Sequence, residues 1–332
     1  MLLNKNIKII LNYFLGPLVF LFLSYSIYYQ ILKQPNWQQS LQQIKNAVSG
    51  PQQWKIWVVI ILMLVNWGIE ARKWQSAICQ VQKISYLRAF KATLTGVTMA
   101  SFTPNRIGEY LGRMLYIEEG KRMQSISLTI ICSIAQLLIT MIAGVAGILY
   151  LKSYLYQHPT PGHLALQFFL NALAFGVIFT FVILTIFYFR VSWLVRLLKK
   201  ISSSGKFLVY IKVLEDFNAT ILLRILSLSF SRYLVFIVQY YLLFSVFGVS
   251  LTWWQTFGGM SVIFLVMAVV PTFTFLTELG LRWEASIQVI ELFSVNTVGI
   301  FATSFGIWLI NLIIPALIGS LLILSIKLFR NK

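Results

Sequence analysis

The sequence predicts an all-α polytopic membrane protein that forms a single transmembrane domain, residues 1–332, and three observations support this. Hydrophobic residues make up 58% of the chain and charged residues only 11%, whereas soluble domains carry about 25% charged residues. Several apolar stretches reach the roughly 20 residues that a helix needs to cross a bilayer. Two further apolar runs are too short to cross and end close to a proline. We therefore expect about six transmembrane helices plus two re-entrant helical hairpins.

The charge balance is strongly basic, with 27 lysines and arginines against 9 acidic residues and a net charge of +18. In a soluble protein such an excess would suggest nucleic acid as a partner. Here most of the basic residues lie in predicted loops, where they orient the chain and attract anionic headgroups. The expected partner is therefore an anionic lipid surface, and no nucleic acid is expected.

The first half of the chain predicts two spans, a short apolar run and a third span. The first span, Ile9–Ile31, lacks a small-residue cleavage site and is too long for a signal-peptide core. The second, Trp54–Glu70, leads to a basic cluster that marks the cytoplasmic side: Arg72, Lys73, Lys83, Arg88 and Lys91. The run Ala92–Phe102 stops before Pro104, and Ser125–Leu151 is the third span. If Ala92–Phe102 crossed fully, the most basic loop would lie outside, so we expect a hairpin that enters from the cytoplasm and returns through Ile107–Ile117.

The second half begins with the span Ala165–Phe189 and continues through a basic segment, Arg190–Arg232, to the span Tyr233–Val249. The basic segment is interleaved with apolar residues. This pattern is typical of an amphipathic segment on an anionic leaflet, and it also fits an orientation signal with no other role.

The second short run, Phe257–Val270, holds about 14 residues, or about 21 Å of helix, against a hydrocarbon core of ~30 Å. It ends at Pro271, and the chain returns through Ala285–Phe293 to a last span, Thr297–Ile326. For the basic tail to be cytoplasmic, this hairpin must enter from outside. We therefore expect a multi-pass protein of the inner (plasma) membrane. Both its N-terminus and its C-terminus are expected in the cytoplasm.

The two halves, residues 1–151 and 165–332, share one order of elements but start from opposite sides. Three crossings in each half make such a duplication inverted in the membrane. Interrupted helices at corresponding positions of two inverted halves indicate a transporter's binding site near the bilayer midplane. The predicted fold is therefore a pair of pseudo-symmetric inverted halves around a polar site.

The first break brings polar side chains to the start of a helix. The candidate substrate-binding residues there are Asn105, Arg106, Glu109 and Arg113, with Pro104 and Gly108 as structural breaks. Glu109 and Arg113 are four residues apart and can pair on one helix face. Arginines beside exposed helix N-terminal amides suit a phosphate or carboxylate. The alternative is a structural salt bridge at the interface, with the charges reaching water.

The second break repeats this pattern. Its candidate substrate-binding residues are Glu278, Arg282 and Glu284, with Pro271 and Gly280 as structural breaks. Glu278 and Arg282 have the same spacing of four as the first pair. The alternative is an external cap with an ordinary helical ion pair. If the two hairpins meet, the two pairs face one another across a polar cavity.

Other chemistry is not supported by the sequence. Ser202–Lys206 lacks the first glycine and the final serine or threonine of a P-loop, so no nucleotide cofactor is expected. His158 and His163 have no nearby carboxylates or cysteines, so no metal site is expected. Glu70 and Arg72 fit a boundary pair at a span end better than a proton relay. No catalytic residues are predicted, because no nucleophile and base arrangement stands out.

At the two breaks the chain resembles the flippase-like membrane domain of lysylphosphatidylglycerol synthases and of the stand-alone YbhN-like group. The first family pattern, roughly P-x-R-x-G-E-x-x-R, is matched by Pro104, Arg106, Gly108 and Glu109, with Arg113 one residue later. The second, a proline and a glycine-rich turn with G-x-x-E, is matched by Pro271, Gly280 and Glu284, while Thr277 and Glu278 replace a family glycine.

The resemblance implies a lipid flippase for aminoacylated phospholipids or polyprenyl-linked sugars. With the arginines at the first break, we expect it to move an anionic or aminoacylated phospholipid, or a polyprenyl-linked lipid, between leaflets. Arg106 and Arg113 would bind a lipid phosphate, and the nearby glutamates would tune the site or pair with a cationic headgroup. The chain lacks the soluble aminoacyl-transferring domain, so we expect that it does not synthesise the lipid itself, and we do not predict an enzyme. Two alternatives remain, a membrane enzyme that modifies lipid headgroups through its glutamates, and a non-transporting subunit of an envelope assembly.

Overall fold

The computed structural model describes residues 49–101, 103, 106–158, 163–190, 218–270 and 275–324, with a few isolated positions before residue 49. Within these residues the regular structure is entirely helical. The predicted first span apart from Tyr25, the residues Pro104, Asn105 and Pro271, and the basic tail lie outside the described residues.

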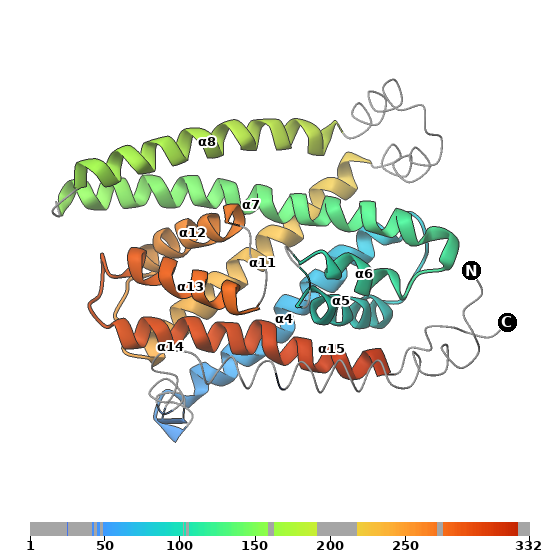
Figure 1. The fold of residues 1–332 in the computed structure, drawn as a ribbon, viewed down its shortest axis with the longest axis horizontal. Helices are drawn as coiled ribbons and strands as arrows, with labels where there is room; N and C mark the ends of the chain where they lie inside the picture. Colours follow the sequence, from blue (N-terminus) through green and yellow to red (C-terminus); the bar gives the residue numbers. More distant parts are fainter. Residues whose placement is uncertain are drawn as a thin grey trace.

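Five helical stretches are long and apolar enough to cross a membrane, and they extend from one end of the molecule toward the other, some along its long axis and some obliquely (Figure 1). They are α4 (Gln53–Ile78), α7 (Arg122–Gln157), α8 (His163–Phe189), α11 (Ala219–Val246) and the continuous run of α14 (Thr297–Trp308), a π-helical turn (Leu309–Ile313) and α15 (Ile314–Leu324). They correspond to five of the six predicted spans. The protein is therefore a multi-pass membrane protein.

Four shorter helices pack in pairs between the long ones. They are α5 (Tyr86–Ala100), α6 (Gly108–Met114), α12 (Trp253–Val269) and α13 (Phe275–Ile290), and a 3₁₀ turn, Glu119–Lys121, follows α6. The α5–α6 pair lies toward one end of the bundle and the α12–α13 pair toward the other (Figure 1). The two short apolar runs of the sequence thus form two helix pairs on opposite sides of the molecular centre.

Side-chain caps explain where several helices begin. The Ser85 side chain accepts a hydrogen bond from the backbone N–H of Arg88 at the start of α5. Thr252 and Gln255 form a reciprocal capping box at the start of α12. Asn296 caps α14 by accepting from the backbone N–H of Gly299. Each cap satisfies amides that a helix start leaves without an intrahelical partner.

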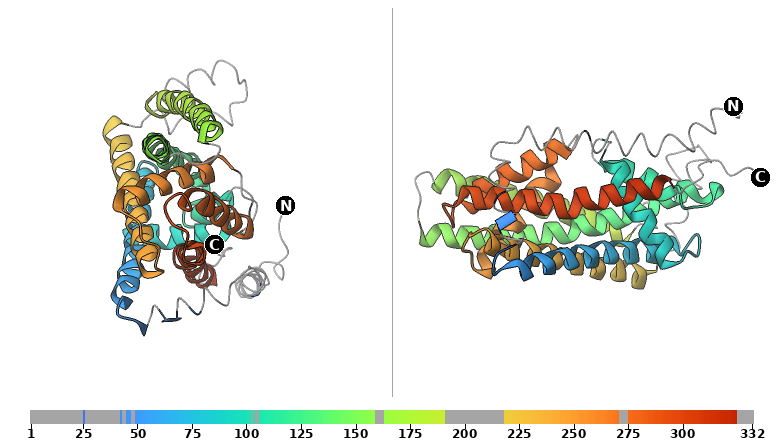
Figure 2. Two further views of the ribbon diagram at one scale, coloured as in Figure 1. Left: turned by 90° about the vertical axis from the view of Figure 1, so that its left-hand side faces the viewer. Right: turned by 90° about the horizontal axis from the view of Figure 1, so that it is seen from below.

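The main core lies where α4, α11 and α14 meet, and it contains the fully buried aromatic residues Tyr240, Phe305 and Trp308. Helix α7 packs against α12, while α8 lies at the outer edge of the bundle against α7 (Figure 2). Only 11% of the most apolar stretch of 18 residues in α8 is buried inside the protein. Most of α8 is therefore available to face lipid.

Glycines allow α5 and α6 to touch backbone to backbone. A Cβ at Gly112 would lie 2.6 Å from the Cα of Gly96, and one at Gly108 would lie 2.1 Å from the carbonyl oxygen of Met99. Only glycine fits at such distances. Gly108 and Gly112 therefore set how closely the two helices pack.

Several predicted boundaries were wrong, because charged side chains lie inside helices rather than in loops. Helix α4 continues past Glu70 to Ile78, so Lys73 is helical and buried. Helix α11 begins at Ala219, so Arg232 lies in its middle and not in a cytoplasmic loop. The polar link before Ala285 is helical from Phe275, and Gly280 does not break it. Lys73, Arg232 and Arg282 each have an acidic partner inside the protein.

Candidate functional site

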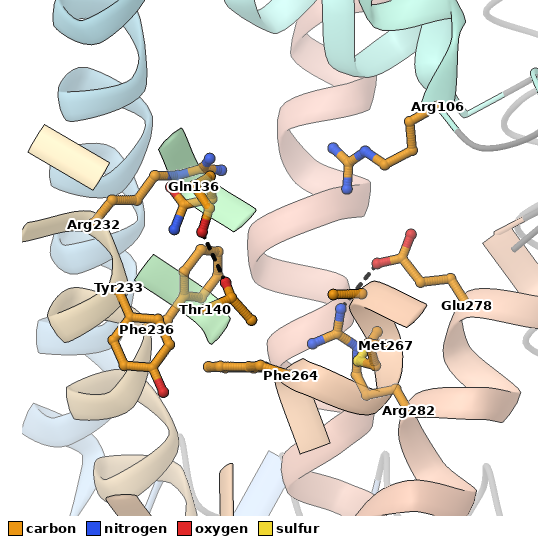
Figure 3. Close-up of a pocket in the computed structure, with 11 residues that line it drawn as sticks. Arg106, Gln136, Thr140, Arg232, Tyr233, Phe236, Phe264, Met267, Glu278 and Arg282 are labelled. Carbon is orange, nitrogen blue, oxygen red and sulfur yellow. Dashed lines mark hydrogen bonds and ion pairs between the residues drawn. The ribbon is translucent and has the colours of Figure 1, made fainter. Parts of the chain in front are cut away.

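A polar cavity of about 270 Å³ opens between α7, α11, α12, α13 and the turn before α6. It is lined by Arg106, Gln136, Thr140, Arg232, Tyr233, Phe236, Phe264, Met267, Ala268, Glu278 and Arg282. Arg106, Glu278 and Arg282 lie on one side of the cavity, and Arg232 and Gln136 lie on the other (Figure 3). Three arginines and one glutamate thus surround one space.

Arg106 is held by an unusual backbone turn. Its φ is +59°, the one positive value outside glycine among the described residues, and this region is uncommon for residues with a side chain. The Thr103 hydroxyl accepts a 2.6 Å hydrogen bond from the backbone N–H of Gly108, which closes the turn. The Nε of Arg106 lies 3.7 Å from Glu109 Oε2, and the side chain is 39% exposed. The turn therefore presents a loosely paired guanidinium to the cavity.

Behind the cavity, Glu70 of α4 is buried and joins three cations. It lies 2.7 Å from Lys73 Nζ, 2.9 Å from a guanidinium nitrogen of Arg113 and 2.7 Å from one of Arg232. Arg113 also pairs with Glu109, four residues earlier. Burying a charge is costly unless partners and hydrogen bonds compensate for lost hydration. Glu70 is therefore the anion that allows three basic side chains from three helices to meet in the interior.

Arg232 is oriented further by amides and rings. Its Nε donates a 2.9 Å hydrogen bond to Asn66 Oδ1, and Asn66 in turn donates to Asn311 of the π-helical turn at 3.3 Å. The guanidinium carbon lies 5.1 Å from the ring centre of Trp67 and 5.5 Å from that of Phe236, within the range of cation–π attraction. These contacts hold the arginine at the cavity wall.

On the opposite wall, Arg282 of α13 has two partners. One guanidinium nitrogen lies 2.9 Å from Glu278 Oε1, and the other donates a 2.6 Å hydrogen bond to the Tyr240 hydroxyl. The Arg282 and Glu278 side chains are each 12% exposed. The predicted pairing of residues four apart is confirmed here, as it is for Glu109 and Arg113.

The predicted site residues do not all lie at the cavity. Arg106, Glu278 and Arg282 line it. Glu109 does not line the cavity but pairs with Arg106, which does. Arg113 lies behind the cavity, with 1% of its side chain exposed. Glu284 does not line the cavity, and instead it accepts a hydrogen bond from Gln288 on α13. Asn105 lies outside the described residues.

The site residues on α4 and α11 were not predicted from the sequence. Glu70 was assigned to a boundary pair with Arg72, whose guanidinium instead bonds Gln75 at the surface. A signal was available, because Asn66, Glu70 and Lys73 are spaced by four and three residues and so share one helix face. The sequence is largely apolar on both sides of Arg232. The predicted span Tyr233–Val249 could therefore have been extended upstream to include this arginine.

No group of three or more potential metal ligands occurs in the described part of the chain. The cavity offers cationic hydrogen-bond donors that are held by ion pairs with Glu109, Glu70 and Glu278. Such donors suit a phosphate or carboxylate, which guanidinium groups bind with two parallel hydrogen bonds.

The model of the lysylphosphatidylglycerol synthase TM region matches residues 9–319. This match covers nearly the whole chain, so the protein belongs to that family. No curated protein and no solved structure matches the chain.

Proposed function

We propose that this member of the lysylphosphatidylglycerol synthase transmembrane family is a carrier that moves a phosphate-bearing lipid between the two leaflets of the inner (plasma) membrane. One observation carries the proposal. Arg106 and Arg282 come from the two separate short-helix pairs and line one cavity together with Arg232. Intramembrane charges are costly and rare, and they mark substrate or ion pathways in many membrane proteins.

In this proposal the α5–α6 and α12–α13 pairs are re-entrant hairpins. They enter from opposite leaflets, and residues 1–151 and 165–332 are inverted halves with both termini in the cytoplasm. Their position toward opposite ends of the bundle supports this arrangement (Figure 1). The cavity between them would then lie near the middle of the bilayer, where carriers of this architecture bind their substrates.

The residues would have distinct roles. Arg106, Arg232 and Arg282 would bind the lipid phosphate. Glu278 would keep Arg282 oriented, and Glu109 would do so for Arg106. Because the sequence carries no P-loop, movement would be passive or coupled to an ion. The chain would carry its substrate without changing it chemically, so it would not be an enzyme.

Proteoliposomes with a fluorescent phospholipid test the proposal. Translocation is measured by quenching the probe in the outer leaflet with an impermeant reductant. Arg106→Gln removes a loosely paired cation from the cavity, and we expect translocation to fall at least tenfold. Arg72→Gln is the matched control, because Arg72 is exposed and its guanidinium bonds Gln75 at the surface, away from the cavity. Its rate should equal that of the unmodified protein.

Two other outcomes would replace the proposal. Conversion of the lipid headgroup without translocation would indicate an enzyme that uses the glutamates. Neither translocation nor conversion, with the folded protein present in the vesicles, would indicate a subunit of a larger assembly.

A further inference from the structure

A second cavity, apolar and about 480 Å³ in volume, lies between α7, α8 and α12. Its lining includes Leu137 and Met141 of α7, Gly176 and Val177 of α8, and Leu265 of α12. This volume falls within the range of sites that hold small molecules. Among the described residues that line it, only Thr180 carries a hydroxyl, and this hydroxyl donates to the Gly176 carbonyl oxygen within α8. We call this second cavity the apolar groove, and its lining is suited to hydrocarbon.

The apolar groove adjoins the arginine cavity along two helices. On α7, Gln136 and Thr140 line the polar cavity while the next residues, Leu137 and Met141, line the groove. On α12, Ala268 lines both spaces. A charged cavity beside an apolar groove suits an amphiphilic ligand, because the headgroup can bind in the cavity while a hydrocarbon chain binds in the groove.

The charges around the polar cavity are unbalanced. Three arginines and one glutamate line it. The ion pairs behind them add two acidic and two basic side chains, Glu70 and Glu109 against Lys73 and Arg113. Together these described residues comprise five basic and three acidic side chains, an excess of two positive charges. An anionic ligand would lower the cost of holding this excess away from water.

We infer that the site binds a phospholipid whose headgroup is net anionic, with the phosphate among Arg106, Arg232 and Arg282 and one hydrocarbon chain in the groove between α7, α8 and α12. The inference rests on the proposed function and narrows it. A lysine-bearing headgroup is net cationic, so it would meet an excess of like charge in this cavity. A phosphatidylglycerol-type headgroup has no such conflict.

The purified full chain in detergent tests the headgroup. Binding is measured by native mass spectrometry with phosphatidylglycerol and with lysylphosphatidylglycerol. We expect phosphatidylglycerol to bind at least tenfold more tightly. Equal or tighter binding of the lysine-bearing lipid would overturn the inference.

Gly176 allows the groove to be filled without disturbing the fold. A Cβ at this position meets no atom within 4 Å. Gly176→Phe should therefore weaken phosphatidylglycerol binding at least tenfold while leaving binding of the soluble headgroup, glycerophosphoglycerol, unchanged. Retained headgroup binding also shows that the variant is folded. The matched control is Ile186→Phe, an exposed position on the same helix that does not line the groove, and it should bind both probes normally.

The outcomes separate this inference from the proposed function. If the Gly176→Phe variant binds phosphatidylglycerol normally, the hydrocarbon chain of the lipid does not lie in the groove, and the inference fails. In that case the proposed carrier function would still stand, provided that translocation depends on Arg106. If translocation is independent of Arg106, the proposed function fails, whatever lipid binds.

Discussion

At the scale of single residues, the interior is organised around one acidic side chain. Glu70 contacts Lys73, Arg113 and Arg232, which come from α4, α6 and α11. The sequence indicated that charge would gather at Arg106 and Arg113, but it did not reveal this partner. A charge near the end of an apolar run resembles a boundary residue, and only packing shows that its partners come from other helices.

Replacing Glu70 with glutamine should destabilise the protein strongly. Glu70→Gln leaves three cations without their shared anion, and breaking a buried ion pair in this way costs about 3–5 kcal/mol. The midpoint of thermal unfolding in detergent, followed by size-exclusion chromatography, measures the loss. Glu118→Gln is the control, since its pair with Lys121 has side chains 62% and 41% exposed and such surface pairs contribute about 0–1 kcal/mol. Equal midpoints for the two variants would contradict the role assigned to Glu70.

At the scale of helices, the sequence predicted the two short pairs but not their exact limits. Proline and charge marked where the apolar runs ended, and α5 and α12 do end near those points. The polar stretch after Pro271 was predicted as a link, yet it is helical from Phe275. The reason is that Arg282 finds partners within the protein, Glu278 and Tyr240. Polar composition alone cannot distinguish a loop from a helix whose charges are paired internally.

The contact between α5 and α6 gives a test at this scale. Gly112→Ala places a Cβ 2.6 Å from the Cα of Gly96, so the two backbones must separate. We expect a loss of about 1–3 kcal/mol, as for other overpacked sites. Gly120→Ala is the control, because a Cβ there meets nothing within 4 Å, and its effect should stay within about 0.5 kcal/mol. The same unfolding measurement applies, and an unchanged midpoint for Gly112→Ala would show that the helices have room to move apart.

At the scale of the whole molecule, length and hydropathy were enough to predict the long helices. The five stretches that could span a membrane match predicted spans. The cavity was harder to predict, because α7 and α11 contribute side chains from the middle of long apolar helices, such as Gln136 and Thr140 of α7, where no proline marks a break in the helix. Which face of a long helix lines a cavity depends on its neighbours, and a single sequence does not specify them.

The proposed orientation in the membrane is testable with an impermeant thiol reagent. Cys79 is exposed at the end of α4, and Cys132 is buried. Gln157 ends α7 at the opposite end of the bundle (Figure 1). In a Cys79→Ser background, Gln157→Cys should be labelled in intact cells, whereas the native Cys79 should react only after permeabilisation. The reverse pattern would invert the topology.

The positive excess around the cavity also has an electrical consequence. Moving one elementary charge through 100 mV changes the free energy by about 2.3 kcal/mol. The described residues at and behind the cavity comprise five basic and three acidic side chains, so a site that rearranged while empty would respond to voltage. With an anionic headgroup bound, the moving charge is smaller and the response weaker. The resting potential would then act mainly on the return of the empty protein, and transport current should reveal which half of the cycle is electrogenic.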